Sequence, residues 1–129
     1  MKKRLFIIIP IAIVFLGMAA TIIHMHISRA NEVYYFSFDG YEDYVEQFPS
    51  DKTYGEIPDA KTAKEVAEKL WIEIYGKETM KNEKPYRVLY DYNTGVWFVY
   101  GTLPSNYVGG TAHALIRNDG RVLAVWHEK

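Results

Sequence analysis

The chain has 129 residues, of which 49% are hydrophobic and 24% are charged, and its formal net charge at pH 7 is −1. It contains no cysteine, which excludes a disulfide framework, a thiolate metal site and a cysteine nucleophile. The small net charge is the balance of three blocks, +4 over residues 1–30, −7 over residues 31–59 and +2 over residues 60–129. None of these blocks is the basic footprint of a nucleic-acid-binding protein.

The first thirty residues read as a membrane anchor and its flank. Leu5 to Ile23 is a run without a charged residue, and Met1-Lys2-Lys3-Arg4 precedes it. A helix over residues 5–23 would be roughly 28 Å long, close to the thickness of the hydrocarbon core of a bilayer. The basic N-terminus predicts a single-pass protein of the cytoplasmic membrane with its N-terminus inside and its domain outside.

A cleaved signal peptide is the alternative for the same residues, and the protein would then be secreted. Ser28-Arg29-Ala30 is compatible with cleavage after Ala30. The apolar core of a signal peptide is shorter, about 7–15 residues, so a retained anchor is the favoured interpretation.

Residues 31–56 form an acidic, aromatic-rich segment that we expect to be a linker. Tyr41, Tyr44, Val45 and Phe48 have helical spacing, which suits a short helix that Pro49 ends. The negative charge would suit a contact with a basic partner, such as a nuclease masked by a mimic of nucleic acid. The favoured interpretation is a solvated spacer that holds the domain away from an anionic membrane surface.

The clearest predicted element is a helix within residues 57–76, at the start of a domain that spans residues 57–129. Asp59 is a natural N-cap and Gly76 a natural C-terminal stop. Its apolar residues recur at the spacing of a single helix face: Ala63, Val66, Ala67, Leu70, Trp71 and Ile74. Such a stripe needs a sheet to cover it.

After Pro85 the hydrophobic period changes to two, which predicts four strands. They cover residues 86–92, 96–101, 111–117 and 122–126, and two Asn-x-Gly turns join them in hairpins. Three-residue loops would pair Tyr92 with Val96 in the first hairpin. In the second, they would pair Ile116 with Val122, Ala114 with Ala124, Ala112 with Trp126, Leu115 with Leu123 and His113 with Val125.

These elements predict an α+β fold in which one long amphipathic helix packs on a four-stranded antiparallel meander. The helix stripe is expected to dock over Ala112, Ala114 and Ala124. The remaining sheet face is either an open interface or covered by residues 31–48. Exposure of Trp97 discriminates between these alternatives, because a buried Trp97 counts against an open face.

No catalytic set stands out in the sequence. His113 is expected in the middle of a strand beside apolar residues, and no nucleophile elbow, phosphate loop or set of closely spaced metal ligands occurs. Gly109-Gly110 would suit an anion, but a tight bend is the favoured interpretation. We therefore expect a protein that is not an enzyme and that uses no cofactor or metal.

Several pieces of the sequence together resemble a known family. They are a helix that starts at Pro58-Asp59-Ala60 and ends at Ile74-Tyr75-Gly76, and a strand that begins with Val96-Trp97 and ends at Gly101-Thr102-Leu103-Pro104. The Gly109-Gly110 loop and the final hairpin with Asp119-Gly120 complete the set. The chain is similar from about Tyr54 to its end to immunity proteins of bacterial polymorphic toxin systems with the nuclear transport factor 2-like (NTF2-like) fold. The matching positions are Pro58, Asp59, Ala63, Trp71, Tyr75, Gly76, Pro85, Trp97, Gly101, Thr102, Leu103, Pro104, Gly109, Gly110 and Gly120.

The resemblance implies a cystatin-like or NTF2-like arrangement and a small protein that neutralises a cognate toxin by binding it. The expected function is that of a membrane-anchored immunity-type protein which occludes its toxin. The alternative is an envelope accessory module that binds a peptide, a cell-wall component or a membrane protein. The candidate partner-binding surface comprises Trp97, Gly101, Thr102, Leu103, Pro104, Tyr107, Gly109, Gly110 and His113.

Overall fold

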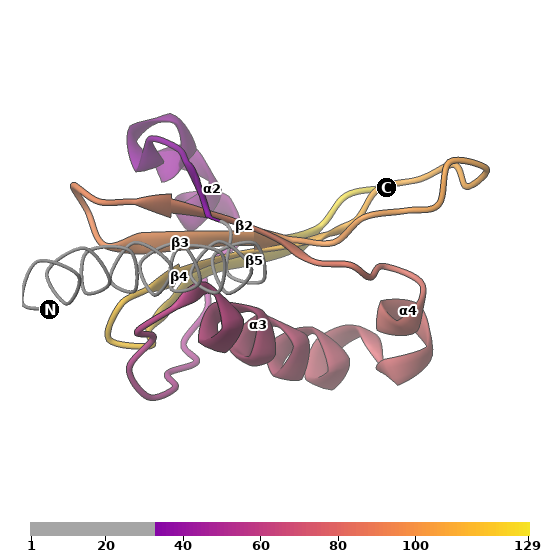
Figure 1. The fold of residues 1–129 in the computed structure, drawn as a ribbon, viewed down its shortest axis with the longest axis horizontal. Coiled ribbons are helices and arrows are strands. Elements are labelled where there is room, and N and C mark those ends of the chain that lie inside the picture. Colours follow the sequence, from indigo (N-terminus) through magenta and orange to yellow (C-terminus); the bar gives the residue numbers. More distant parts are fainter. Residues whose placement is uncertain (1–32) are drawn as a thin grey trace, which may run out of the picture. The chain divides into compact units, whose positions relative to one another are not determined.

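A five-stranded sheet forms the centre of residues 33–129, which are the residues that the computed structural model describes (Figure 1). The strands lie in chain order: β1 (Tyr34–Tyr35), β2 (Arg87–Asp91), β3 (Val96–Tyr100), β4 (Ala112–Arg117) and β5 (Val122–His127). The last four form the expected antiparallel meander. β1 adds a fifth strand, parallel to β2, that the predicted four-stranded sheet lacked.

The predicted membrane anchor, residues 5–23, lies outside the described residues. Within residues 33–129, no helix has both the length and the apolar character needed to cross a bilayer.

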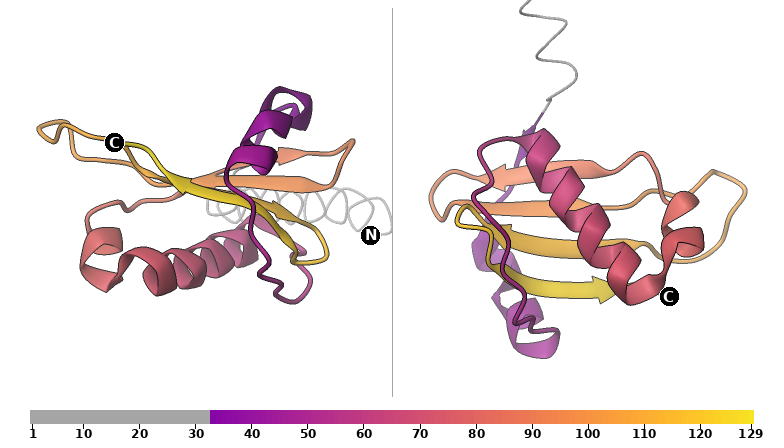
Figure 2. Two further views of the ribbon diagram at one scale, coloured as in Figure 1. Left: turned by 180° about the vertical axis from the view of Figure 1, so that it is seen from behind. Right: turned by 90° about the horizontal axis from the view of Figure 1, so that it is seen from below.

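The long helix α3 (Ala60–Tyr75) covers one face of the sheet, as Figure 2 shows in its right-hand view. The Asp59 carboxylate accepts from the backbone N–H of Thr62 at 2.8 Å, which confirms the predicted N-cap. Gly76 ends the helix with a φ of 91°, a conformation that costs other residues more. A short helix, α4 (Lys77–Lys81), follows and buries Met80.

The predicted apolar stripe of α3 is buried over most of its length. Ala63, Ala67, Leu70 and Trp71 have no exposed surface, and they pack against β2, β3 and β4. Ile74, expected in the same stripe, lies in the last turn of α3 and is 48% exposed. The core under the helix therefore ends near Trp71 and Met80.

The opposite face of the sheet is covered by residues 36–48, which corrects the expected linker. The helices η1 (Phe38–Tyr41) and α2 (Glu42–Gln47) place their aromatic rings over β3 and β5. Figure 1 shows α2 and α3 on opposite sides of the sheet. The segment folds because its rings bury apolar area on the sheet while its carboxylates stay in water. Residues 33–129 accordingly form one compact unit.

The chain passes from the α2 side to the α3 side along the outer edge of β5. Val125 N–H donates to the Phe48 carbonyl at 3.1 Å, and Val122 N–H donates to the Lys52 carbonyl at 3.0 Å. Isolated bridges join Pro49 to Ala124 and Thr53 to Arg121 in the same region. This connection protects the β5 edge from pairing with another strand.

The register of the first hairpin differs by one residue from the prediction. Asp91 pairs with Val96 and Tyr90 pairs with Trp97, so the turn has four residues rather than three. The reason is Asp91, whose carboxylate accepts from the N–H of Asn93 at 2.8 Å and from the N–H of Phe38 at 2.9 Å. The shift places Trp97 on the α3 side of the sheet.

The second hairpin starts in the predicted register and then departs from it. Ile116 pairs with Val122 as expected, but an irregularity between Leu115 and Ile116 moves all further pairs by one residue. Leu115 therefore pairs with Ala124, and His113 pairs with Trp126. Ala112 and Ala114 lie under α3 as predicted, whereas Ala124 lies on the opposite face.

Candidate functional site

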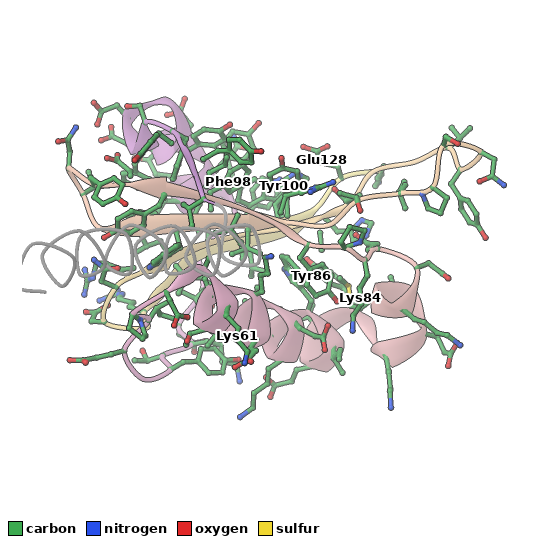
Figure 3. All side chains as sticks on the ribbon, in the orientation of Figure 1. Lys61, Lys84, Tyr86, Phe98, Tyr100 and Glu128 are labelled. Atoms are coloured by element: carbon green, nitrogen blue, oxygen red, sulfur yellow. The ribbon has the colours of Figure 1, made fainter. Side chains whose placement is uncertain are left out.

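A groove lies beside α2 on the face of the sheet opposite α3, and we call it the aromatic groove. It consists of two hollows of about 330 and 370 Å³, both of which are bordered by Tyr44, Trp126 and Glu128. The other residues of its walls are Tyr41, Asp43, Gln47, Phe48, Leu89, Phe98, Tyr100, His113 and His127. Figure 3 labels Phe98, Tyr100 and Glu128 on this side of the sheet and Tyr86 on the other.

The floor of the groove is a row of rings on three adjacent strands. Tyr100 pairs with His113, which in turn pairs with Trp126. The rings of His113 and Trp126 are stacked with centroids 5.1 Å apart, and those of Tyr100 and His113 are 6.0 Å apart. The regular strand spacing thus produces a continuous aromatic surface.

The wall of the groove is supplied by the helices that cover this face. Tyr44 stacks on Trp126 with a centroid distance of 4.6 Å, and Tyr41 packs on Phe98 at 5.0 Å. Both tyrosines are half-buried, so their rings form the side of the groove as well as part of the core. The wall exists because Tyr41 and Tyr44 stand on one face of η1 and α2.

Two carboxylates border the groove. Asp43 lies in α2, and Glu128 follows β5 with its side chain 56% exposed. Glu128 Oε1 is 3.6 Å from Nε2 of His113, and His113 Nδ1 donates to the Thr111 carbonyl at 2.8 Å. Burial lowers the pKa of His113, although Glu128 acts in the opposite direction. The larger effect, burial, thus favours the neutral imidazole of His113 beside Glu128.

The loop between β3 and β4 leaves the sheet at the floor of this groove. Figure 1 shows it extending beyond the ends of the strands. Its tip is apolar and open to solvent, since Tyr107 is 55% exposed and Val108 is fully exposed. Pro104 and Gly109 are also exposed, and Leu103 is partly buried. Of the predicted surface, Leu103, Pro104, Tyr107, Gly109 and His113 are brought to one end of the sheet, and Val108 joins them there.

Gly101 and Thr102, predicted for the same surface, are tied to the chain before β2. Thr102 N–H donates to the Glu83 carbonyl at 2.8 Å, and its hydroxyl donates to the Pro85 carbonyl at 2.8 Å. A methyl group on Gly101 would lie 2.8 Å from Oε1 of Glu83. Gly110 is packed just as closely against the backbone of Glu128. These residues fix the base of the loop rather than its outer surface.

Glu83 is a buried acid that the sequence analysis did not single out. Its Oε1 accepts from the N–H of Ala112 at 2.6 Å, and its Oε2 accepts from Nε2 of His127 at 2.8 Å. The side chain is 3% exposed. It fastens the chain before β2 to the start of β4 and the end of β5. No local pattern marks it, because its partner His127 is 44 residues away.

Trp97 does not belong to this surface. It is 5% exposed, packs on the α3 side and donates through Nε1 to Oδ1 of Asn118 at 2.8 Å. A buried Trp97 and a covered second face decide against the open aromatic sheet that was one of the two alternatives.

A larger hollow, about 540 Å³, lies at the other end of the sheet between the chain before α3 and the two hairpin turns. Its polar groups already bind one another, because Asn118 Nδ2 donates to the Tyr90 hydroxyl at 2.7 Å and also binds Trp97 through Oδ1. We place the candidate site at the aromatic groove instead, where an exposed apolar loop adjoins it. Within residues 33–129, no three His, Asp or Glu side chains are grouped as metal ligands would be.

A comparison with models of protein families identifies the family of this chain. The model of a family described as "NTF2 fold immunity protein" matches residues 62–129, from the first turn of α3 to the C-terminus. The chain belongs to this family of immunity proteins. The resemblance stated from the sequence motifs is therefore confirmed, and the α+β sheet and helix arrangement agrees with the fold.

The family match includes the floor of the aromatic groove but not its wall. Tyr100, His113 and Trp126 lie within residues 62–129, whereas Tyr41 and Tyr44 precede them. The comparison with curated proteins and the comparison with solved structures gave no match.

Proposed function

We propose that this protein is a membrane-anchored immunity protein that neutralises a cognate bacterial toxin by binding and occluding it. The observation that carries the proposal is the exposed apolar tip, Tyr107 and Val108, of a β3–β4 loop that starts at the floor of the aromatic groove in a member of an immunity family. The proposal needs no catalysis, cofactor or metal, because an immunity protein acts by covering a surface of its toxin.

The loop and the groove have the composition of a protein interface. Tyrosine and tryptophan give large contact areas at a small cost in conformational entropy, and they are enriched among the residues that dominate binding energy. The β3–β4 loop, which carries the exposed Tyr107 and Val108, extends beyond the ends of the strands (Figure 1), and the groove is a hollow beside η1 and α2. A partner that binds around the loop would contact both the protruding loop and the recessed groove.

The proposed location follows from the N-terminal residues. An anchor over residues 5–23, with the basic N-terminus in the cytoplasm, would hold the domain outside the cytoplasmic membrane. Protection at this place suits a toxin that acts on the envelope or enters through it.

The test uses the full-length chain, tagged at its C-terminus, to capture the products of adjacent genes from detergent-solubilised cells. A captured toxin and survival of cells that produce both proteins are the expected results. The double variant Tyr107→Ser/Val108→Ser should weaken capture by about tenfold or more while the protein stays folded, since both side chains are exposed. A matched control is Asn106→Ser, in the same loop.

Two outcomes would decide against this function. The first is that the chain captures no adjacent product and protects cells from none of them. The second is capture of a cell-wall hydrolase or a sensor kinase, which would support the alternative of an envelope accessory module.

A further inference from the structure

We propose that the aromatic groove binds a cationic peptide segment of the partner, with an arginine or lysine side chain lying between α2 and Glu128. This inference deepens the proposed function, because it rests on the same groove and states the chemistry of the toxin surface that the groove accepts.

The first argument is the charge of the wall. The η1–α2 segment carries no basic residue and has four exposed carboxylates, which belong to Asp39, Glu42, Asp43 and Glu46. Within the described residues, none of these four lies in an ion pair. Elsewhere on the surface, by contrast, Glu68 is paired with Lys84 and Asp119 is paired with Arg117. The wall therefore has negative charge that the domain itself does not neutralise.

The second argument is where that charge meets the groove. Asp43 borders one hollow, Glu128 borders both, and no lysine or arginine is among the residues that line either one. Arg87 on β2 pairs with Tyr100 and so stands at the far end of the ring row. A cation that enters between Asp43 and Glu128 is attracted by both carboxylates, whereas an acidic peptide or a nucleic acid is repelled.

The third argument is the shape and chemistry of the walls. The long side chains of arginine and lysine bury their methylene groups on apolar surface and keep the charged head group at its edge. Rings of Tyr44, Tyr100 and Trp126 offer such a surface, and arginine also stacks on aromatic rings. The head group would then reach the carboxylate of Glu128, which is half-exposed at the mouth of the groove.

A fourth observation favours a peptide over a free cation. The indole N–H of Trp126 is buried and has no hydrogen-bond acceptor among the described residues. The rings of Tyr44 and Phe48 stack on Trp126, at 4.6 and 5.9 Å between centroids. A peptide bound in the groove brings backbone carbonyls, the acceptor that this N–H lacks, whereas a bare cation brings none.

The range of the family match distinguishes the floor of the groove from its wall. The floor lies within the matched residues and the acidic wall lies outside them. We assign partner specificity to the wall for this reason: the floor provides contact area, and η1 and α2 select a basic segment.

The first test needs no toxin. The full-length chain in neutral detergent, labelled with ¹⁵N, is titrated with the blocked peptide Gly-Arg-Phe-Arg-Gly, and the three indole N–H resonances are followed. The resonance of Trp126, assigned with Trp126→Phe, should shift, while those of Trp71 and Trp97 on the other face should not. Binding should weaken by about tenfold when both arginines of the peptide are replaced by glutamine, and it should weaken as salt is raised.

Three results would overturn the inference in this test: no shift of Trp126, an equal affinity for the glutamine peptide, or a shift confined to Trp71 or Trp97. Glu128→Gln and Asp43→Asn should each weaken the arginine peptide several-fold. Arg87→Gln should leave its affinity unchanged or increase it. The matched control Glu65→Gln, on the exposed face of α3, should have no effect.

The second test uses the captured toxin. The variant Glu42→Lys/Asp43→Lys/Glu46→Lys should reduce its affinity by about a hundredfold, and Glu65→Lys/Glu73→Lys on α3 should not. If the toxin binds but the α2 variant binds it equally well, the inference fails and the proposed function stands. If no toxin is captured although the arginine peptide binds at Trp126, the proposed function fails and the groove keeps its assigned ligand.

Discussion

Glu83 shows how one buried side chain determines the geometry of the candidate site. It joins three segments through Ala112, His127 and the close approach of Gly101. These contacts hold the start of β4, which supplies His113 to the floor of the groove, and the base of the β3–β4 loop. Gly101 and Thr102, which were predicted for the binding surface, therefore contact Glu83 instead. The exposed residues of the loop follow them in the chain.

Replacing Glu83 by alanine should lower the free energy of unfolding by roughly 3 kcal/mol, because a buried N–H and a histidine lose their shared acceptor. Denaturant unfolding of the full-length chain measures the change. Glu78→Ala, at an exposed position of α4, is the control and should change stability by less than about 0.5 kcal/mol. Equal stability of the two variants would show that Glu83 is not a fastening point.

The protonation of His113 should make the domain less stable in mild acid. Burial lowers its pKa in the folded state, so the unfolded chain takes up a proton first as the pH falls below about 6.5. Stability is then lost from about pH 6.5 downward and is fully present above it. Glu128 and Glu83, which favour the charged form, reduce the effect, while His127 adds to it.

Unfolding measured between pH 7.5 and pH 5 is the readout, since these limits bracket the ordinary pKa of histidine, about 6.5. In His113→Phe the loss of stability over this interval should be smaller. The carboxylates with lowered pKa values, Asp59, Glu68, Asp91 and Asp119, lose most of their stabilising effect below this interval, and they are unchanged in His113→Phe. An unchanged pH profile in His113→Phe would contradict the prediction.

Among the elements, those with a local signal were predicted well from the sequence. The apolar period, Asp59 and Gly76 identify α3, and the change to a period of two identifies the four strands of the meander. Each of these features depends on residues that are close together in the chain. Hydrophobic patterning and capping chemistry are therefore sufficient to find them.

What the sequence analysis missed depends on contacts between distant residues. The turn after β2 has four residues because Asp91 also binds the N–H of Phe38, 53 residues away. The irregularity in the last hairpin moved Ala124 and Trp126 to the other face. Whether residues 36–48 cover the second face of the sheet was left undecided. The stretch with helical spacing is short, and the strands on which it packs lie far along the chain. The groove combines all three features, and so it was not predicted.

The contribution of α2 can be measured by truncating its central ring. Tyr44→Ala should lower the free energy of unfolding by about 2 kcal/mol, because it removes a stacked ring from Trp126. The fluorescence of Trp126 should shift to longer wavelength as water reaches it. Glu46→Ala, on the exposed side of the same helix, should change neither quantity. A Tyr44→Ala protein with native stability would mean that the segment contributes little to the fold.

At the scale of the whole molecule, the placement of the domain is the main prediction. A reporter enzyme that matures only outside the cytoplasm, fused after Lys129, should be active and should sediment with membranes. Deleting residues 2–23 should abolish both properties, because the apolar run is expected to anchor the chain. An intact N-terminus in the cytosolic fraction would contradict the anchor, and a soluble extracellular fusion that begins at Asn31 would indicate cleavage after Ala30.

The aromatic groove takes one side from Tyr41 and Tyr44 in the η1–α2 segment and its floor from Tyr100, His113 and Trp126 on β3, β4 and β5. Segments that are far apart in the chain must therefore dock on one another before the groove exists. A partial opening that releases η1 and α2 but keeps α3 on the sheet would preserve most of the core while erasing the groove. Recognition would accordingly be lost at milder denaturant concentrations than the fold itself.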